Sequence, residues 1–410
     1  MGDAEPTVAV CTPASHDAFT ELAAKHATAH VLTLDDSGVG SLSSAADSAS
    51  EQHETVARDA DDLAAILYTS GTTGRSKGAM LSHANLSTNA LALHEIWAFE
   101  AGDVLLHALP IFHVHGLFVA LHCALLNGSR ILFLPKFDLA EVLARLPRST
   151  VFMGVPTFYT RLLQSAEFSA EACKDMRLFV SGSAPMLAET FDEFESRTGH
   201  TILERYGMTE AGMITSNPYE GQRIASTVGY ALPDVQTRVA DDEGNVLGVD
   251  EIGVLEIRGP NVFKGYWRMP EKTAEEFRGD GWFITGDMST MATDGRVAIV
   301  GRAKDLIISG GLNVYPKEIE SLLDDIDGVG ESAVIGLAHP DFGEAVAAVI
   351  TTDNNSRAVS EQEIIAALAD QLAAFKRPKR VFVVDSLPRN AMGKVQKKQL
   401  RDIYEGTFRK

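Results

Sequence analysis

The stretch from Thr69 to Lys77 (Thr-Ser-Gly-Thr-Thr-Gly-Arg-Ser-Lys) combines glycines, hydroxyl side chains and one lysine directly after an apolar run at residues 63–67. Glycine adopts positive φ without steric penalty, so the backbone N–H groups can approach a ligand closely. Successive N–H groups in such a turn form an anion-binding concavity, to which hydroxyls and Lys77 add donors and positive charge. Ser76 precedes Lys77, so the stretch is not a Walker A loop. The residue types favour a polyphosphate ligand, although an ordinary turn after a strand has a similar composition.

Further short motifs follow along the chain. They are Phe112-His113-Val114-His115-Gly116, Gly182-Ser183-Ala184-Pro185, Tyr206-Gly207-Met208-Thr209-Glu210, Gly281-Trp282-Phe283-Ile284-Thr285-Gly286-Asp287, Gly301-Arg302-Ala303-Lys304-Asp305 and Pro388-Arg389-Asn390-Ala391-Met392-Gly393-Lys394. In this order, and with the glycine-rich stretch, they resemble the signatures of the adenylate-forming enzymes. That superfamily comprises acyl-CoA synthetases, luciferases and peptide-synthetase adenylation domains. The resemblance runs from about residue 60 to about residue 405.

The resemblance implies an AMP-forming acid–thiol ligase that works in two steps. A carboxylate attacks the α-phosphate of ATP to give an acyl-adenylate and pyrophosphate, and the thiol of coenzyme A then attacks the mixed anhydride. The implied small molecules are ATP, coenzyme A and Mg²⁺. Phosphoryl chemistry depends mainly on positioning and charge stabilisation, so the protein has to supply donors and cations.

The same resemblance assigns side chains to the nucleotide. Residues expected to hold the β- and γ-phosphates are Thr69, Ser70, Gly71, Thr72, Thr73, Gly74 and Lys77. Residues expected to line the AMP site are Ser183, Ala184, Pro185, Glu204, Tyr206, Gly207 and Met208, with Tyr206 stacking on adenine. Asp287 would accept both ribose hydroxyls with help from Arg302, and the alternative for Asp287 is an acid that caps the turn at Gly286.

Four residues are implied in catalysis: Thr209, Glu210, His113 and Lys394. Thr209 would donate to the α-phosphate, and Glu210 would bind Mg²⁺, which prefers carboxylate and phosphate oxygens. Lys394 would neutralise charge shared between the attacking carboxylate and the α-phosphate, and loss of such a donor typically costs about 10²–10³ in rate. From composition alone, Lys394 in a lysine-rich tail would instead be a solvated cation.

Lys304 occupies the position at which the family places a hinge. Rotation there would withdraw Lys394 after the first half-reaction and present Ser309, Gly310 and Gly311 to the pantetheine arm of coenzyme A. A hinge needs only a few backbone dihedrals to change. The alternative is an exposed linker lysine.

Arg205 bears on the identity of the acid. In the family, the residue before the motif tyrosine lines the acyl pocket, and an unpaired arginine there would be costly beside a fatty chain. A second carboxylate would suit it, because a guanidinium holds a carboxylate in a bidentate grip. His113 and Arg223 are further candidates to contact the acid. Pairing of Arg205 or Arg223 with a protein acid such as Glu204 is the alternative.

The segment from Glu204 to Gly221 also resembles the malonyl-CoA synthetase branch of the family, which implies a malonate–CoA ligase. Another short diacid such as methylmalonate fits the same reasoning. Two further hypotheses stay open: an adenylation enzyme that loads a carrier protein, and a truncated nucleotide-binding protein with weak catalysis.

Bulk properties limit the partners. A formal charge of −20 argues against nucleic acid or an anionic membrane. Three cysteines without metal or disulfide spacing fit a reducing compartment. The sequence has no apolar run of membrane-spanning length and no secretory signal, so the expected location is the cytoplasm. Composition does not indicate an oligomeric state.

At 410 residues the chain exceeds the size of one hydrophobic core. Short buried strands at residues 130–134, 151–155 and 178–182, separated by helical stretches, predict an α/β fold of parallel βαβ units. A smaller β lobe with turns at residues 242–244 and 293–295 is expected after residue 225. An α+β tail is expected after residue 305, with a helix at residues 360–372.

The expected organisation is an AMP-binding domain at 1–300, a hinge at 301–305 and a mobile C-terminal domain at 306–410. Residues 1–35 resemble the end of a βαβ unit, and residues 36–62 a surface excursion. Family members usually carry more residues before this point, so we expect a fragment or a shortened product.

Overall fold

The structure is a computed structural model that describes residues 1–69, 76–352, 359–390 and 393–408. The chain separates into two compact units, residues 1–59 and 60–410. In the first unit, the parallel strands β1 (Val8–Cys11) and β2 (His30–Thr33) flank α1 (His16–His26), which confirms the predicted βαβ unit. Residues 48–59 carry no regular structure, as expected of a surface excursion, but α2 (Ser41–Asp47) forms just before them.

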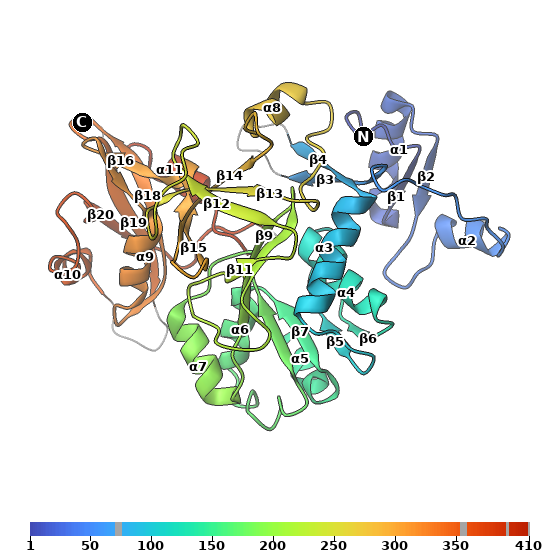
Figure 1. Ribbon diagram of the computed structural model, residues 1–410, viewed down its shortest axis with the longest axis horizontal. Coiled ribbons are helices and arrows are strands. Elements are labelled where there is room, and N and C mark those ends of the chain that lie inside the picture. The colour runs from blue at the N-terminus through green and yellow to red at the C-terminus, as the bar shows by residue number, and fades with distance from the viewer. Residues whose placement is uncertain (70–75, 353–358, 391–392, 409–410) are drawn as a thin grey trace. The chain divides into compact units, whose positions relative to one another are not determined.

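The largest sheet of the second unit has the predicted parallel βαβ character (Figure 1). Its strand order is β11-β10-β9-β8-β7-β5-β6, and β5 to β9 run parallel. The strands are β5 (Val104–His107), β6 (Arg130–Phe133), β7 (Val151–Gly154), β8 (Leu178–Ser181), β9 (Leu203–Met208), β10 (Gly212–Ser216) and β11 (Tyr230–Ala231). The intervening helices are α3 (His83–Ile96), α4 (Leu121–Leu126), α5 (Leu139–Arg145), α6 (Pro156–Leu163) and α7 (Ala188–Thr198). β7 and β8 are buried along their whole length, as is typical of a sheet covered on both faces.

The two ends of the glycine-rich stretch belong to an antiparallel strand pair. Its strands are β3 (Leu63–Thr69) and β4 (Lys77–Ser82), and the last pair in their register is Thr69 with Lys77. Residues 264–267 continue this pairing on the other side of β4, because Met80 donates its N–H to Gly265 and Trp267 donates to Gly78. Backbone hydrogen bonds on both sides of β4 therefore fix the strand that follows the glycine-rich stretch.

A four-stranded antiparallel sheet forms the predicted β lobe. Its strands are β12 (Gln236–Ala240), β13 (Gly253–Arg258), β14 (Phe283–Met291) and β15 (Val297–Arg302), and α8 (Pro270–Glu275) lies between β13 and β14 in sequence. Turns at residues 242–244 and 293–295 occur where the sequence predicts them.

The last sheet has its own core. It contains β16 (Ile307–Ser309), β17 (Leu312–Val314), β18 (Val329–His339), β19 (Gly343–Thr352) and β20 (Arg380–Val383). Alternate residues of β18 and β19 pack on opposite faces, against α9 (Pro316–Asp324) and α10 (Glu361–Ala367) on one face and α11 (Lys397–Tyr404) on the other. α10 ends at Ala367 rather than at the predicted residue 372, because hydrogen bonds from Ala369 to Ala366 and from Gln371 to Leu368 tighten its last turn. The domain boundaries around residues 301–305 remain a prediction.

Candidate active site

Two parallel strands bring the adenine and acid motifs to one edge of the large sheet. β8 and β9 pair with Ser181 opposite Glu204, so the segments that follow them leave the sheet side by side. This carboxyl edge is where open α/β sheets place their ligands. Gly182 faces Arg205 so closely that an added Cβ would lie 2.1 Å from its Nη1. A glycine is therefore required at position 182 for Arg205 to occupy its place.

Arg205 is the least satisfied cation of the site. It is 3% exposed, and its Nε and Nη2 have no hydrogen-bond partner in the part of the chain that the structure describes. Burial lowers the pKa of Arg205 to about 9. Buried polar groups are nearly always hydrogen-bonded, so an orphaned guanidinium indicates an anionic ligand.

Glu204 does not pair with Arg205. Successive residues of a strand point to opposite faces of the sheet, so neighbours on β9 cannot reach each other. The Glu204 carboxylate instead accepts the N–H of Ser226 at 3.2 Å, and burial raises its pKa to about 7. This hydrogen bond ties Glu204 to the loop that carries Ser226, and its place at the nucleotide stays a prediction.

His113 is a neutral donor beside Arg205. Its Nδ1 accepts the backbone N–H of His115 at 3.2 Å, which leaves the imidazole proton on Nε2. Burial, together with the charges of Lys394 and Arg205, lowers the pKa of His113 to about 4. His113 can therefore donate a hydrogen bond to an anion without carrying charge above about pH 5.

Lys394 lies among the charged groups of the site. It follows a tight turn in which Gly393 has φ +74°. The backbone N–H of Lys394 donates to Asn390 Oδ1 at 3.0 Å. Burial and the charge of Arg302, then that of Arg205, lower the pKa of Lys394 to about 8, while Asp287 and Glu210 oppose this change. The C-terminal lysine is thus close enough to the predicted residues of the other motifs to feel their charges.

Asp287, Arg302 and Tyr206 form one cluster. Asp287 and Arg302 are directly paired residues of β14 and β15, and Arg302 Nε lies 2.6 Å from Asp287 Oδ1. The Tyr206 hydroxyl donates to Asp287 Oδ2 at 2.5 Å. Burial raises the pKa of Asp287, and the charge of Arg302 opposes the rise. The carboxylate is held in one orientation, as a group that accepts two vicinal hydroxyls requires.

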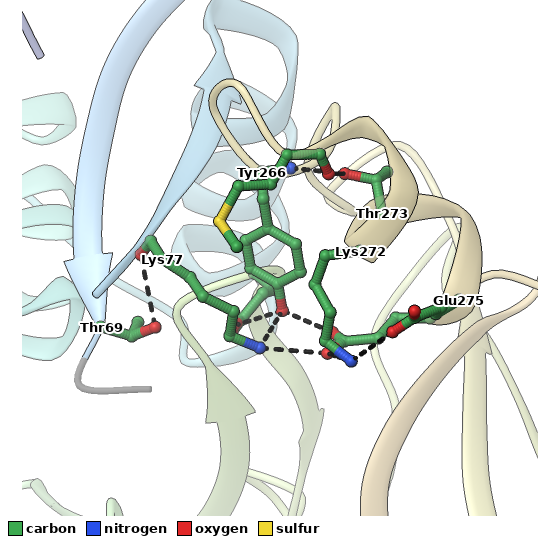
Figure 2. Close-up of polar contacts among 9 residues, drawn as sticks. Thr69, Lys77, Tyr266, Lys272, Thr273 and Glu275 are labelled. Carbon is green, nitrogen blue, oxygen red and sulfur yellow. Dashed lines mark hydrogen bonds and ion pairs between the residues drawn. The ribbon is translucent and has the colours of Figure 1, made fainter. Parts of the chain in front are cut away.

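Lys77 and Glu210 meet at a second cluster, drawn in Figure 2. Lys77 Nζ donates to the Tyr266 hydroxyl and to Glu276 Oε1, each at 3.0 Å, and lies 4.3 Å from the centre of the Tyr266 ring. The same hydroxyl lies 3.0 Å from Glu210 Oε1 and 2.5 Å from Glu276 Oε2. Lys272 reaches Glu276 Oε1 at 3.2 Å. One tyrosine hydroxyl therefore joins the lysine of the glycine-rich stretch to the acid of the Tyr206–Glu210 motif.

Comparisons with known proteins match this arrangement. The AMP-binding enzyme family model matches residues 1–267, and the model for the C-terminal domain of AMP-binding enzymes matches residues 318–394. The chain belongs to the AMP-binding enzyme family.

Solved and curated relatives of this AMP-binding enzyme agree on the branch. An ATP-bound structure of MatB from Rhodopseudomonas palustris is 56% identical, with a TM-score of 0.97 over 99% of this chain and 81% of that one. A malonyl-CoA ligase product complex with methylmalonyl-CoA and AMP is 35% identical, with a TM-score of 0.64 over 94% of this chain and 81% of that one. A malonate–CoA ligase of Arabidopsis thaliana is 42% identical over 84% of this chain. The chain spans 61% of the length of that relative.

Magnesium is the metal that this family implies, and the carboxylate assigned to it by the resemblance, that of Glu210, is buried. Within the described residues, no group of three or more His, Cys, Asp or Glu side chains could hold a metal alone. Glu210 is 6% exposed, and burial raises its pKa. Mg²⁺ is usually held by one or two carboxylates together with substrate phosphates. The site therefore fits a magnesium ion that arrives on the triphosphate.

The remaining predicted residues are placed as follows. Thr209 lies with Glu210 in the turn between β9 and β10, and Ser183 (φ +69°) lies 3.4 Å from His115 Nδ1 through its hydroxyl. Lys304 is exposed in the short turn between β15 and β16, where partial desolvation and then the charge of Arg302 lower its pKa. Gly310 (φ +60°) and Gly311 (φ +79°), which follow Ser309, form the two-residue turn between β16 and β17. Ser70, Gly71, Thr72, Thr73 and Gly74 lie outside the described residues.

Arg223 is bonded to backbone carbonyls in this structure, and its contact with the acid stays a prediction. Its Nε, Nη1 and Nη2 donate to the backbone carbonyls of Pro218, Thr201 and Tyr219 at 3.1, 2.6 and 2.9 Å. Each nitrogen of the guanidinium therefore has a backbone acceptor, which anchors Arg223 to its own loop, while Nη1 and Nη2 each carry a second N–H group.

The sequence did not reveal Tyr266 and Glu276. They lie 189 and 199 residues after Lys77, and neither belongs to a stretch with an obvious chemical pattern. Tyr266 is 2% exposed and packs against Phe263, so its ring looks like an ordinary core aromatic. Only the three-dimensional structure brings its hydroxyl to Lys77.

Proposed function

We propose that this chain is an ATP-dependent malonate–CoA ligase that forms malonyl-CoA, AMP and pyrophosphate through a malonyl-adenylate. The observation that carries the proposal is the buried guanidinium of Arg205, whose Nε and Nη2 lack a partner among the described residues. A fatty acyl chain would leave that charge uncompensated, whereas a second carboxylate supplies both the charge and the acceptors it lacks.

The charges around Arg205 support a diacid. Arg205 and Lys394 act on the titration of His113, so two cations and one neutral donor lie within electrostatic range of one another. In the proposed complex, Arg205 binds the distal carboxylate of malonate, while Lys394 and the Nε2 proton of His113 face the reacting one. A short diacid can span such a pair of cationic groups, and a monoacid cannot neutralise both.

The first step forms a bond between a carboxylate oxygen and the α-phosphorus of ATP and breaks the bond to the β-phosphate oxygen. Lys394 stabilises the negative charge that is shared during this transfer, and Thr209 donates to the α-phosphate. Lys77 holds the departing pyrophosphate, and Asp287 with Arg302 fixes the ribose. Glu210 would hold the magnesium ion, which would supply additional neutralisation of the phosphate charge.

In the second step, the thiol sulfur of coenzyme A bonds to the acyl carbon, the bond to AMP breaks, and the thiol loses its proton. Ser309, Gly310 and Gly311 are proposed to face the pantetheine arm after rotation at Lys304. The short turn from Ala303 to Asp305 has few backbone dihedrals to change, which supports this place for the hinge.

Methylmalonate is the second candidate acid. A similar ligase was solved with methylmalonyl-CoA and AMP bound. One methyl group is typically worth only about 10–200-fold in discrimination, whereas a lost polar partner is worth about 10⁴–10⁵. We therefore expect methylmalonate to be accepted and propionate to be rejected.

The test is AMP release by the chain with a panel of malonate, methylmalonate, acetate, propionate and butyrate, with and without coenzyme A. The expected result is coenzyme A-dependent AMP release with the diacids alone. ATP–pyrophosphate exchange that needs malonate, with no AMP release on adding coenzyme A, would instead indicate loading of a carrier protein. Comparable turnover of acetate, butyrate and malonate would refute the assignment to diacids.

A further inference from the structure

Glu276 lies between two lysines. Its Oε1 accepts from Lys77 at 3.0 Å and lies 3.2 Å from Lys272 Nζ, and its Oε2 accepts from the Tyr266 hydroxyl at 2.5 Å. Figure 2 shows the side chains of Lys77 and Lys272 extending from different elements toward each other beside Tyr266. Burial alone would raise the pKa of Glu276, but hydrogen bonds from Tyr266 and Lys77 outweigh it and keep the pKa below its usual value.

Without the carboxylate, this arrangement would not hold. Two ammonium groups that contact the same oxygen would then face each other across a few ångströms with no anion between them, and like charges repel. Lys77 would lose the carboxylate that holds its ammonium beside the Tyr266 hydroxyl. It would turn away from Lys272 and from the Tyr266 hydroxyl.

Tyr266 extends the connection to the metal-binding acid. Its hydroxyl accepts from Lys77 and lies within hydrogen-bond distance of Glu210 Oε1. Its ring is fixed by edge contacts to Phe263 and by a backbone N–H that donates to Thr273 at 2.9 Å. The distance between the ammonium of Lys77 and the carboxylate of Glu210 is thereby set by a rigid group.

We infer that Glu276 and Tyr266 are positioning residues that place the Lys77 ammonium for the β- and γ-phosphates of ATP. They act through Lys77 and do not touch the acid. The inference rests on the proposed nucleotide role of Lys77, but it is independent of which acid the protein activates.

The test measures binding of α,β-methylene-ATP with Mg²⁺ to the whole chain by calorimetry, without acid or coenzyme A. Glu276→Ala should weaken this binding about tenfold, the effect of losing one hydrogen bond to a charged group. Binding of AMP, which lacks the β- and γ-phosphates, should stay within about twofold. Because no acid is present, the result stands apart from whether malonate is the substrate.

Glu275→Ala is the matched control. Glu275 is the neighbouring acid and pairs only with Lys272 at 3.0 Å among the contacts of the described residues, so its removal changes the local charge equally without touching Lys77. We expect no change in triphosphate binding for this variant. Equal weakening by Glu275→Ala and Glu276→Ala would reduce the effect to general charge and overturn the inference.

A double mutant of Lys77 and Glu276 distinguishes a positioning effect of Glu276 on Lys77 from a general effect on folding. In a Lys77→Ala background, Glu276→Ala should have no further effect on binding, because its action passes through the missing lysine. Tyr266→Phe keeps the packed ring and removes only the hydroxyl, so it provides the same comparison if Glu276→Ala does not fold. Tighter triphosphate binding in Glu276→Ala, or equal losses for AMP and the triphosphate, would contradict the positioning role.

Discussion

Replacement of Arg205 by methionine should make the ligand-free protein more stable and nearly inactive on malonate. Methionine has a similar length and no charge, so it can fill the space beside Gly182. Burial lowers the pKa of Arg205 to about 9. One pKa unit corresponds to about 1.4 kcal/mol, so keeping the guanidinium charged costs the empty site roughly 3–5 kcal/mol.

The Arg205→Met variant should regain part of the free energy of unfolding that the buried charge of Arg205 costs. Exchange of buried ions for apolar residues stabilises other proteins by about 1–4 kcal/mol, and we expect Arg205→Met to raise the free energy of unfolding by a similar amount. Its kcat/KM for malonate should fall by about 10²–10⁴, since truncating one member of a buried charge pair typically costs about 2–5 kcal/mol. Activity on butyrate relative to malonate should rise.

The assay combines thermal unfolding without ligand and AMP release with each acid. Arg223→Met is the matched control, because that arginine donates to three backbone carbonyls. It should lower stability and affect all acids alike. A loss of stability in Arg205→Met equal to that in Arg223→Met, with malonate turnover reduced less than tenfold, would refute the reasoning.

Further predictions concern Lys394, Asp287, Glu204 and Lys304. The pKa of Lys394 is lowered to about 8, so kcat/KM for adenylation should fall as the pH rises above 8 and the ammonium is lost. Lys394→Ala should be about 10²–10³ slower, and persistence of the same decline in this variant would exclude Lys394 as its source. Asp287→Asn should weaken AMP binding by about tenfold or more, but not binding of 2′,3′-dideoxy-AMP, as calorimetry can measure. The folded pKa of Glu204, about 7, lies above its unfolded value, so its contribution to stability is present at low pH and lost as the pH rises through 7. Wild type should therefore lose roughly 3 kcal/mol more than Glu204→Gln between pH 5 and pH 8 in denaturant titrations. Lys304→Pro should spare pyrophosphate exchange and block thioester formation, and equal loss of both would argue against a hinge.

The sequence predicted the elements whose signals are local. Apolar runs located β7 and β8, and the motif around Tyr206 located the turn that carries Glu210. The end of α10 was placed five residues too far along, because the apolar period continues beyond Ala367 while the hydrogen bonds of its last turn do not.

Contacts between distant segments could not be predicted in the same way. Whether an arginine is paired depends on every side chain around it, so sequence alone could not distinguish the orphaned Arg205 from the satisfied Arg223. Neighbours in the sequence also need not form an ion pair, because the side chains of Glu204 and Arg205 lie on opposite faces of β9. The connection from Lys77 to Glu276 spans 199 residues and leaves no spacing pattern.

The close approach of Arg205 to the backbone at Gly182 makes these two positions interdependent. A side chain at 182 would clash with Arg205 in its present position, and the clash would be relieved by a smaller residue at 205. An evolving or engineered ligase that turns to uncharged acids would therefore change position 205 first. A later substitution at 182 would then fill the vacated volume and block return to the diacid, so the order of two mutations governs whether a switch of substrate can be reversed.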